Sequence, residues 1–240
     1  MDALHRDAAK KVRAPVVLDR LAAAYPDASI ALHFSNAWEL LVATVLSAQC
    51  TDKKVNEVTA TFFPRYPGPA AIAAAPAEEL EEHLRPTGFF RQKTKNIQAA
   101  ARAVLDEHGG EVPGTMPELL TLPGVARKTA NVVLSNGFGQ QDGIAVDTHV
   151  RRIARRLGFT RHDDPVKIER DLMRLYPPQR WLSVSDLFIA HGRRTCDAQR
   201  PRCADCPIED LCPSSQIAGR RDRHRTAVPP RPRGRRARTT

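Results

Sequence analysis

Apolar residues recur at helical spacing along most of this chain, with polar and charged residues between them. No segment alternates apolar and polar residues between turn signals, as a half-buried strand would. The pattern predicts helices over residues 16–25, 36–47, 51–63, 76–84, 89–108, 127–136, 147–157, 165–176 and 178–196. We therefore predict an all-α protein in which the strongly apolar run 36–47 lies deep in a core.

Capping residues mark several of these helix boundaries. Asn36 precedes the apolar run, and Thr51 or Asp52 can cap the helix after it. Asp147 stands where the helix 147–157 begins, so its carboxylate is predicted to accept a backbone N–H as the N-cap. Glycine and proline at 109–114 break the chain before the stretch that follows.

The stretch 122–130, LPGVARKTA, combines a tight turn with the start of a helix. Pro123 presets the backbone angle for a turn, and Gly124 permits a conformation that other residues resist. Such a turn directs several backbone N–H groups outward at a helix N-terminus, which is a site for an anion. A DNA phosphate would suit it.

Lys128 lies in the first turn of this helix, directly after Arg127. The positive end of the helix dipole and the adjacent cation both favour the neutral amine, which is the nucleophilic form. From these residues alone, a solvated lysine at a helix start and a phosphate-binding turn are equally good interpretations, and catalysis ranks behind both.

Composition and charge place the chain among globular proteins with a basic extension. Its 240 residues are 42% hydrophobic and carry a net charge of +10. Residues 218–240 hold nine Arg and one Asp, which leaves +2 for the rest. We expect this tail to be disordered and either to bind nucleic acid nonspecifically or to aid solubility. No run approaches the roughly 20 apolar residues of a membrane span, so the predicted location is cytoplasmic, with the nucleoid.

Four cysteines gather near the end of the predicted fold, in the pattern C-x6-C-x2-C-x5-C: Cys196, Cys203, Cys206 and Cys212. Thiolates at this density can enclose one metal centre, and their spacing alone does not distinguish zinc from a [4Fe–4S] cluster. The loop 197–202, which includes Arg200, is the part of this segment that we expect to face DNA. Cys50 lies far away in sequence and is interpreted as a small core residue.

The turn and the cysteine spacing together resemble the endonuclease III family of helix-hairpin-helix DNA glycosylases. The matching motifs span residues 36–212: LSAQ at 46–49, LPGVARKTANVV at 122–133, VDTH at 146–149, HGR at 191–193 and the cysteine run. The resemblance implies a [4Fe–4S] cluster on the four cysteines and two helical domains with a DNA cleft between them. One is a six-helix domain, 31–140; the other is the cluster domain, 1–30 with 141–217.

The resemblance also implies a chemistry. Lys128 matches the lysine that attacks C1′ of a damaged nucleoside, expels the base and forms a Schiff base, and Asp147 matches the carboxylate that assists it. Gln49 matches the glutamine that fills the hole left by the extruded base, and Phe89 stands in a wedge loop where leucine is common. The remaining DNA-contact residues predicted in this way are Arg91, Gly124, Ala126 and His149, with a second glycine common where Ala126 stands.

The predicted function is therefore base-excision repair. A monomeric enzyme would remove oxidised pyrimidines from double-stranded DNA and cut the abasic site by β-elimination. Three alternatives stand beside it: a monofunctional mismatch glycosylase, a noncatalytic metal-cluster DNA-binding protein and an electron-transfer module. The pairing of Lys128 with Asp147 argues against the last two, because neither needs an amine and a carboxylate together.

Overall fold

The computed structural model describes residues 5–217, and every regular element in that range is helical, which confirms the all-α prediction. The predicted basic tail, 218–240, lies outside the described residues. No helix within 5–217 is long and apolar enough to cross a membrane. The α-helices are α1 (Lys10–Ala24), α2 (Ala37–Leu46), α3 (Asp52–Arg65), α4 (Gly68–Ala74), α5 (Ala77–Leu84), α6 (Phe90–His108), α7 (Met116–Leu119), α8 (Arg127–Gly137), α9 (Thr148–Arg156), α10 (Pro165–Met173) and α11 (Trp181–Arg194).

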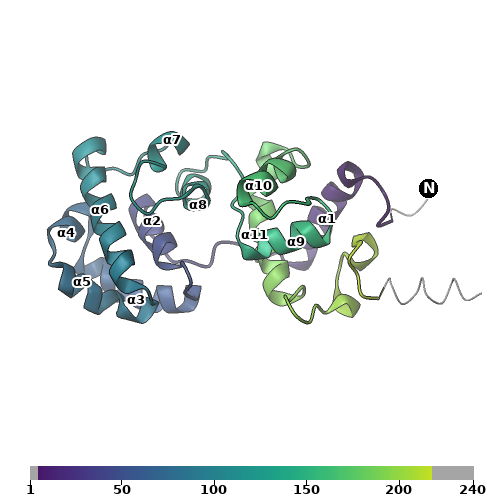
Figure 1. Ribbon diagram of the computed structural model, residues 1–240, viewed down its shortest axis with the longest axis horizontal. Coiled ribbons are helices and arrows are strands. Elements are labelled where there is room, and N and C mark those ends of the chain that lie inside the picture. Colours follow the sequence, from purple (N-terminus) through teal and green to yellow (C-terminus); the bar gives the residue numbers. More distant parts are fainter. Residues whose placement is uncertain (1–4, 218–240) are drawn as a thin grey trace, which may run out of the picture.

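The helices surround two separate hydrophobic cores. The first draws its residues from Leu32 to Leu134, and α2 is buried along almost its whole length within it. The second joins α1 to the chain from Ile144 to Leu211. Figure 1 shows α2 to α8 at one end of the molecule, and α1 beside α9, α10 and α11 at the other. The N-terminal helix therefore belongs to the half that carries the four cysteines.

The capping residues predicted from the sequence are found at the helix starts. The Asn36 side chain accepts a hydrogen bond from the backbone of Glu39, and that of Thr51 accepts one from Lys54. Asp147 caps α9 by accepting the backbone N–H of Val150 at 2.8 Å. Since a cap fixes the direction in which the chain enters a helix, these residues set the positions of the loops that precede α2, α3 and α9.

Several predicted boundaries are wrong. Helix α1 begins at Lys10 instead of residue 16, and Pro15 lies inside it. The last long helix begins at Trp181, after a 3₁₀ turn at Pro178–Arg180, because the two prolines at 177–178 do not continue as α-helix. The short helices α4 and α7 were not predicted. With seven and four residues, they are too short to show a helical period.

Candidate active site and cysteine segment

The turn before α8 has the geometry that its sequence predicts. Gly124 has φ +80°, and a Cβ built on it would lie 2.7 Å from Cβ of Asn96 on α6. Glycine is therefore required both by the backbone angle and by the close packing against α6. Ala126 has an ordinary extended conformation, φ −95° and ψ 168°, so an alanine there causes no strain. No side chain caps α8, which leaves its first N–H groups without a side-chain acceptor.

Lys128 and Asp147 come together in a cleft between the two cores. Lys128 is on the first turn of α8, Asp147 caps α9, and both line two adjoining cavities of about 100 and 550 Å³. Both side chains are half-buried. Since the cap uses one carboxylate oxygen for the N–H of Val150, the other oxygen can act on a neighbouring group. An amine and a carboxylate from different halves thus face one cleft.

One reason that we gave for a neutral Lys128 is wrong. Arg127 is not a free neighbouring cation, because its guanidinium is bound to the buried carboxylate of Glu169 on α10. Arg127 Nε lies 2.5 Å from Glu169 Oε2, and Nη2 lies 3.1 Å from Oε1. Asn131 also donates to Oε1, at 2.8 Å. The residues before and after Lys128 on α8 therefore attach this helix to the other half of the molecule.

Gln49 and Phe89, the two residues predicted to enter the duplex and called the wedge residues below, lie on exposed turns. Gln49 and Phe89 have φ +53° and +48°, and no other non-glycine residue in the described part of the chain has a positive φ. Phe89 is 67% exposed, so it is not part of the hydrophobic core. Gln49 lines the larger cavity, together with Lys128 and Asp147.

The other predicted DNA-contact residues are spread along the molecule. His149 lines the larger cavity, and burial lowers its pKa, opposed by the nearby Asp147. Arg91 is exposed at the start of α6, 3.7 Å from Glu81. Arg200 is exposed in the cysteine segment, where its backbone N–H donates to Asp197. Arg91 and Arg200 do not line either cavity, so they would meet DNA outside the cleft.

Two acidic residues of the cleft were not predicted as site residues. Asp52 at the start of α3 forms an ion pair of 2.7 Å with Arg193 on α11, and both residues line the two cavities. Asp186 on α11 lines the smaller cavity, and burial raises its pKa to about 6. The available signal for Asp186 was that it is the single acid of α11 and directly precedes three apolar residues. The sequence explained Asp52 as a possible helix cap, and it gave no reason to predict an ion pair between Asp52 and Arg193 across the cleft.

The four thiols line one cavity of about 60 Å³ in the second half of the molecule. Among the described residues, no three His, Cys, Asp or Glu side chains are placed to bind one metal ion together. A zinc ion needs its ligands to converge at about 2.3 Å, whereas each thiolate of a [4Fe–4S] cluster binds a different iron. Four thiols around one shared space provide the number and kind of ligands that a [4Fe–4S] cluster requires.

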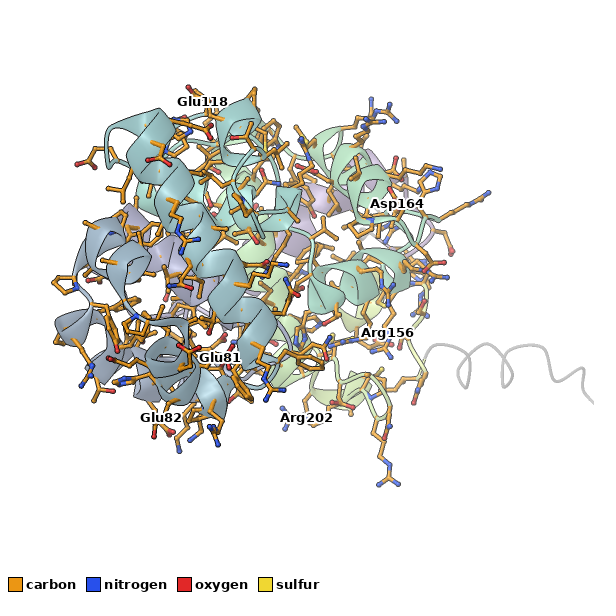
Figure 2. All side chains as sticks on the ribbon, turned by 60° about the vertical axis from the view of Figure 1, so that its left-hand side comes forward. Glu81, Glu82, Glu118, Arg156, Asp164 and Arg202 are labelled. Atoms are coloured by element: carbon orange, nitrogen blue, oxygen red, sulfur yellow. The ribbon has the colours of Figure 1, made fainter. Side chains whose placement is uncertain are left out.

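Arginine side chains and burial set the electrostatics of this cavity. Arg156 on α9 donates to Sγ of Cys196 at 3.1 Å and to the carbonyl of Asp197 at 2.6 Å. Figure 2 shows Arg156 beside the yellow-green C-terminal segment that carries Arg202. Burial raises the pKa of Cys206 to about 12 and that of Cys212 to about 11. Thiolates here therefore need further positive charge, which a bound metal centre supplies.

A helix-hairpin turn, an amine and a carboxylate at one cleft define a class of DNA-repair protein. Residues 42–178 match the model of the HhH-GPD superfamily of base excision DNA repair proteins. Two solved structures share the fold with a TM-score of 0.84 and 44% sequence identity, and each is matched over its whole length. They are a non-covalent endonuclease III–DNA complex and a trapped endonuclease III–DNA covalent intermediate, and they cover 89% and 88% of this chain.

Curated relatives identify the branch of this superfamily. Endonuclease III of Synechocystis sp. is 52% identical over 215 residues, covering 90% of this chain and 98% of the relative. Endonuclease III of Escherichia coli K12 is 41% identical over 82% of this chain and 92% of the relative. The chain belongs to the endonuclease III family, as its sequence motifs had indicated.

Proposed function

We propose that this protein is a bifunctional DNA glycosylase and abasic-site lyase that acts on oxidised pyrimidines in double-stranded DNA. The single observation that carries the proposal is that Lys128 and Asp147, from opposite halves of the molecule, line the same cleft. The similarity to a trapped endonuclease III–DNA covalent intermediate supports a step in which protein and DNA are joined. We treat the two cores as two domains, 31–140 and 1–30 with 141–217, and the protein as a monomer on nucleoid DNA.

Lys128 supplies the nucleophile in this proposal. Its amine attacks C1′ of the extruded nucleoside, the glycosidic bond breaks, and the base leaves with the bonding electrons and a proton. The proton on the nitrogen then passes to the ring oxygen, the bond from C1′ to that oxygen breaks, and the opened sugar is left as an iminium. Because the iminium acidifies the C2′ proton, loss of that proton expels the 3′ phosphate and cuts the strand. Asp147 stabilises the positive charge that develops on the sugar, while its other oxygen continues to cap α9.

The remaining site residues hold the DNA. The phosphate next to the lesion binds the N–H groups of the turn at Gly124 and Ala126, where α8 begins without a side-chain cap. Gln49 and Phe89 enter the duplex on exposed turns and occupy the space that the extruded base leaves. Arg91, His149 and Arg200 contribute positive or hydrogen-bonding groups along the backbone.

Cys196, Cys203, Cys206 and Cys212 would hold a [4Fe–4S] cluster in this proposal, because their four thiols surround one cavity. When bound, the cluster supplies a cross-link among four points of a segment that has only two 3₁₀ turns, Cys203–Asp205 and Glu209–Leu211. That segment carries Arg200, so the cluster fixes where this side chain meets DNA. It takes no part in the steps at the sugar.

Borohydride trapping tests the proposal. The full chain is incubated with an abasic-site duplex and borohydride, which reduces a Schiff base to a stable amine and leaves protein and DNA joined. We expect an adduct with the parent and with Lys167→Ala, an exposed lysine of α10, and none with Lys128→Ala. An iron-loaded parent that gives no adduct would refute the lyase activity. An adduct that persists in Lys128→Ala would refute the assignment of the nucleophile.

A further inference from the structure

The two proposed wedge residues share an unusual backbone. Gln49 and Phe89 both adopt a left-handed conformation without being glycine, which costs on the order of 1 kcal/mol each. They are 40 residues apart in sequence, and they follow different elements, α2 and the 3₁₀ turn Arg85–Thr87. Such a conformation persists only where the surrounding structure imposes it. Both turns therefore require contacts with the surrounding structure that keep their backbone in this conformation.

One buried side chain contacts both turns. Lys93 on α6 is only 4% exposed, and its Nζ donates to the carbonyl of Leu46 and to that of Thr87, each at 2.8 Å. Leu46 is the last residue of α2, three positions before Gln49, and Thr87 is two positions before Phe89. The backbone N–H of Lys93 also donates to the carbonyl of Phe89, at 3.1 Å. The Lys93 side chain thus joins the backbone just before Gln49 to the backbone just before Phe89.

A lysine is suited to this position. The last carbonyls of a helix have no partner within the helix, and they form its negative end, so a cation with several donors stabilises them. An ammonium group has three N–H donors, and here two of them reach backbone segments from different parts of the chain. Burial lowers the pKa of Lys93, with the nearby Cys50 opposing the shift. The two hydrogen bonds that Lys93 donates to backbone carbonyls offset part of the cost of burying its charge.

We propose that Lys93 is a positioning residue for base extrusion, which sets Gln49 and Phe89 at a fixed separation so that both enter the duplex together. The inference rests on the proposed function, because it assigns Lys93 a role only through those two residues. Lys93 itself does not line the cleft and does not touch the reacting atoms. Its loss should therefore affect steps that open a paired duplex and spare the chemistry at an abasic site that is already unpaired.

The test compares two substrates under single-turnover conditions. One is a duplex with thymine glycol opposite adenine, and the other is a single strand with one abasic site, trapped with borohydride. Lys93→Met should lower the excision rate in the duplex by about 10-fold, as expected from the cost of extruding a base, and change adduct formation on the single strand by less than about 3-fold. Lys95→Met, an exposed lysine on the same helix, is the matched control and should resemble the parent on both substrates.

A double-mutant cycle separates positioning from general stability. In a Gln49→Ala, Phe89→Ala background the wedges are gone, so Lys93→Met should have almost no further effect on excision. Lys93→Gln, whose shorter amide reaches one carbonyl, is measured in parallel and should show a smaller loss on the duplex, which keeps the test valid if Lys93→Met does not fold. An equal loss on both substrates, or a full loss in the wedge-free background, would overturn the positioning role. A parent that gives no adduct on the single strand would instead overturn the proposed function.

Discussion

The two halves of this molecule are stabilised in different ways. Around α2, apolar side chains close the core, and the buried charge there is Lys93, whose two acceptors are backbone carbonyls. The half that contains α11 buries Arg13, Glu169 and His191, and it ends in a segment with little regular structure. In this half, the guanidinium of Arg13 donates one hydrogen bond to the carbonyl of Leu157 and another to that of Leu211. Both halves have an apolar core, and buried polar contacts add more to the packing of the second half than to that of the first.

This difference has a consequence for how each half responds to change. Apolar packing is non-directional and tolerates substitutions that conserve volume, whereas a buried polar network depends on every partner. The half that contains α11 should therefore be the more sensitive to loss of a metal centre, to pH and to single polar substitutions.

The largest effect should come from a cysteine of the segment 196–212. Cys206→Ala removes one of the four points that the proposed cluster joins, and loss of a metal site belongs to the changes that exceed about 4 kcal/mol. Urea unfolding with an iron assay measures it. Cys50→Ala is the matched control, because this half-buried thiol belongs to the other half, and it should cost no more than about 1 kcal/mol. Equal costs for the two variants would show that the cysteine segment is not cross-linked.

Asp186 should make stability depend on pH. Because burial raises its folded pKa to about 6, above its ordinary value of 3.8, the stability that it contributes is complete below about pH 4 and is lost as pH rises through 6. A shift of this size corresponds to about 3 kcal/mol. Asp186→Asn should therefore stabilise the protein at pH 8 and leave it unchanged at pH 4, as measured by urea unfolding at each pH. Asp163→Asn, an exposed acid outside the cleft, should show no such difference.

Features that depend on neighbouring residues could be predicted from the sequence, whereas contacts between distant residues could not. The caps Asn36, Thr51 and Asp147 and the turn at Gly124 were predictable, because each depends on a local rule of backbone geometry. The joining of Lys128 and Asp147 in one cleft followed from resemblance to a family, since residues 19 positions apart in separate helices leave no local signal.

Long-range polar contacts account for most of what could not be predicted. Glu169 and Lys93 lie on helices whose other charged residues are exposed or half-buried, so their sequence pattern predicts an exposed position. Only the packing of α10 against α8, or of α6 against α2, shows that they are buried. The spacing of apolar residues along a helix cannot predict a hydrogen bond between a side chain and a carboxylate or carbonyl that is far away in sequence.

Glu169→Gln should have an intermediate effect. It removes the charge that pairs with Arg127 but keeps an oxygen that can accept from Asn131. Breaking a buried pair costs about 3–5 kcal/mol, and because Arg127 is 36% exposed we expect about 2 kcal/mol. The rate of adduct formation should also fall, since α8 loses its ion pair with α10. Breaking the exposed pair of Arg155 and Asp163 should cost less than about 1 kcal/mol, and an equal cost for both would contradict a special role for Glu169.

Asp147→Asn should have the smallest effect on stability and one of the largest effects on activity. Asn and Asp are equally good N-caps, so Asp147→Asn should change the free energy of unfolding by less than about 0.5 kcal/mol. An amide carries no charge, however, and cannot stabilise a positive charge on the sugar, so excision should slow by about 100-fold or more. Asp164→Asn is the matched control, because Asp164 caps α10 in the same way but does not line the cleft.

If both caps tolerate asparagine and only Asp147→Asn loses excision, the carboxylate acts through its charge and the cap is a separate role of the same side chain. If Asp147→Asn instead lowers stability and activity together, the position matters chiefly because it fixes the start of α9. Single-turnover excision and urea unfolding on the same preparations distinguish these outcomes. The comparison is decisive because one helix start faces the amine of Lys128 across the cleft and the other does not.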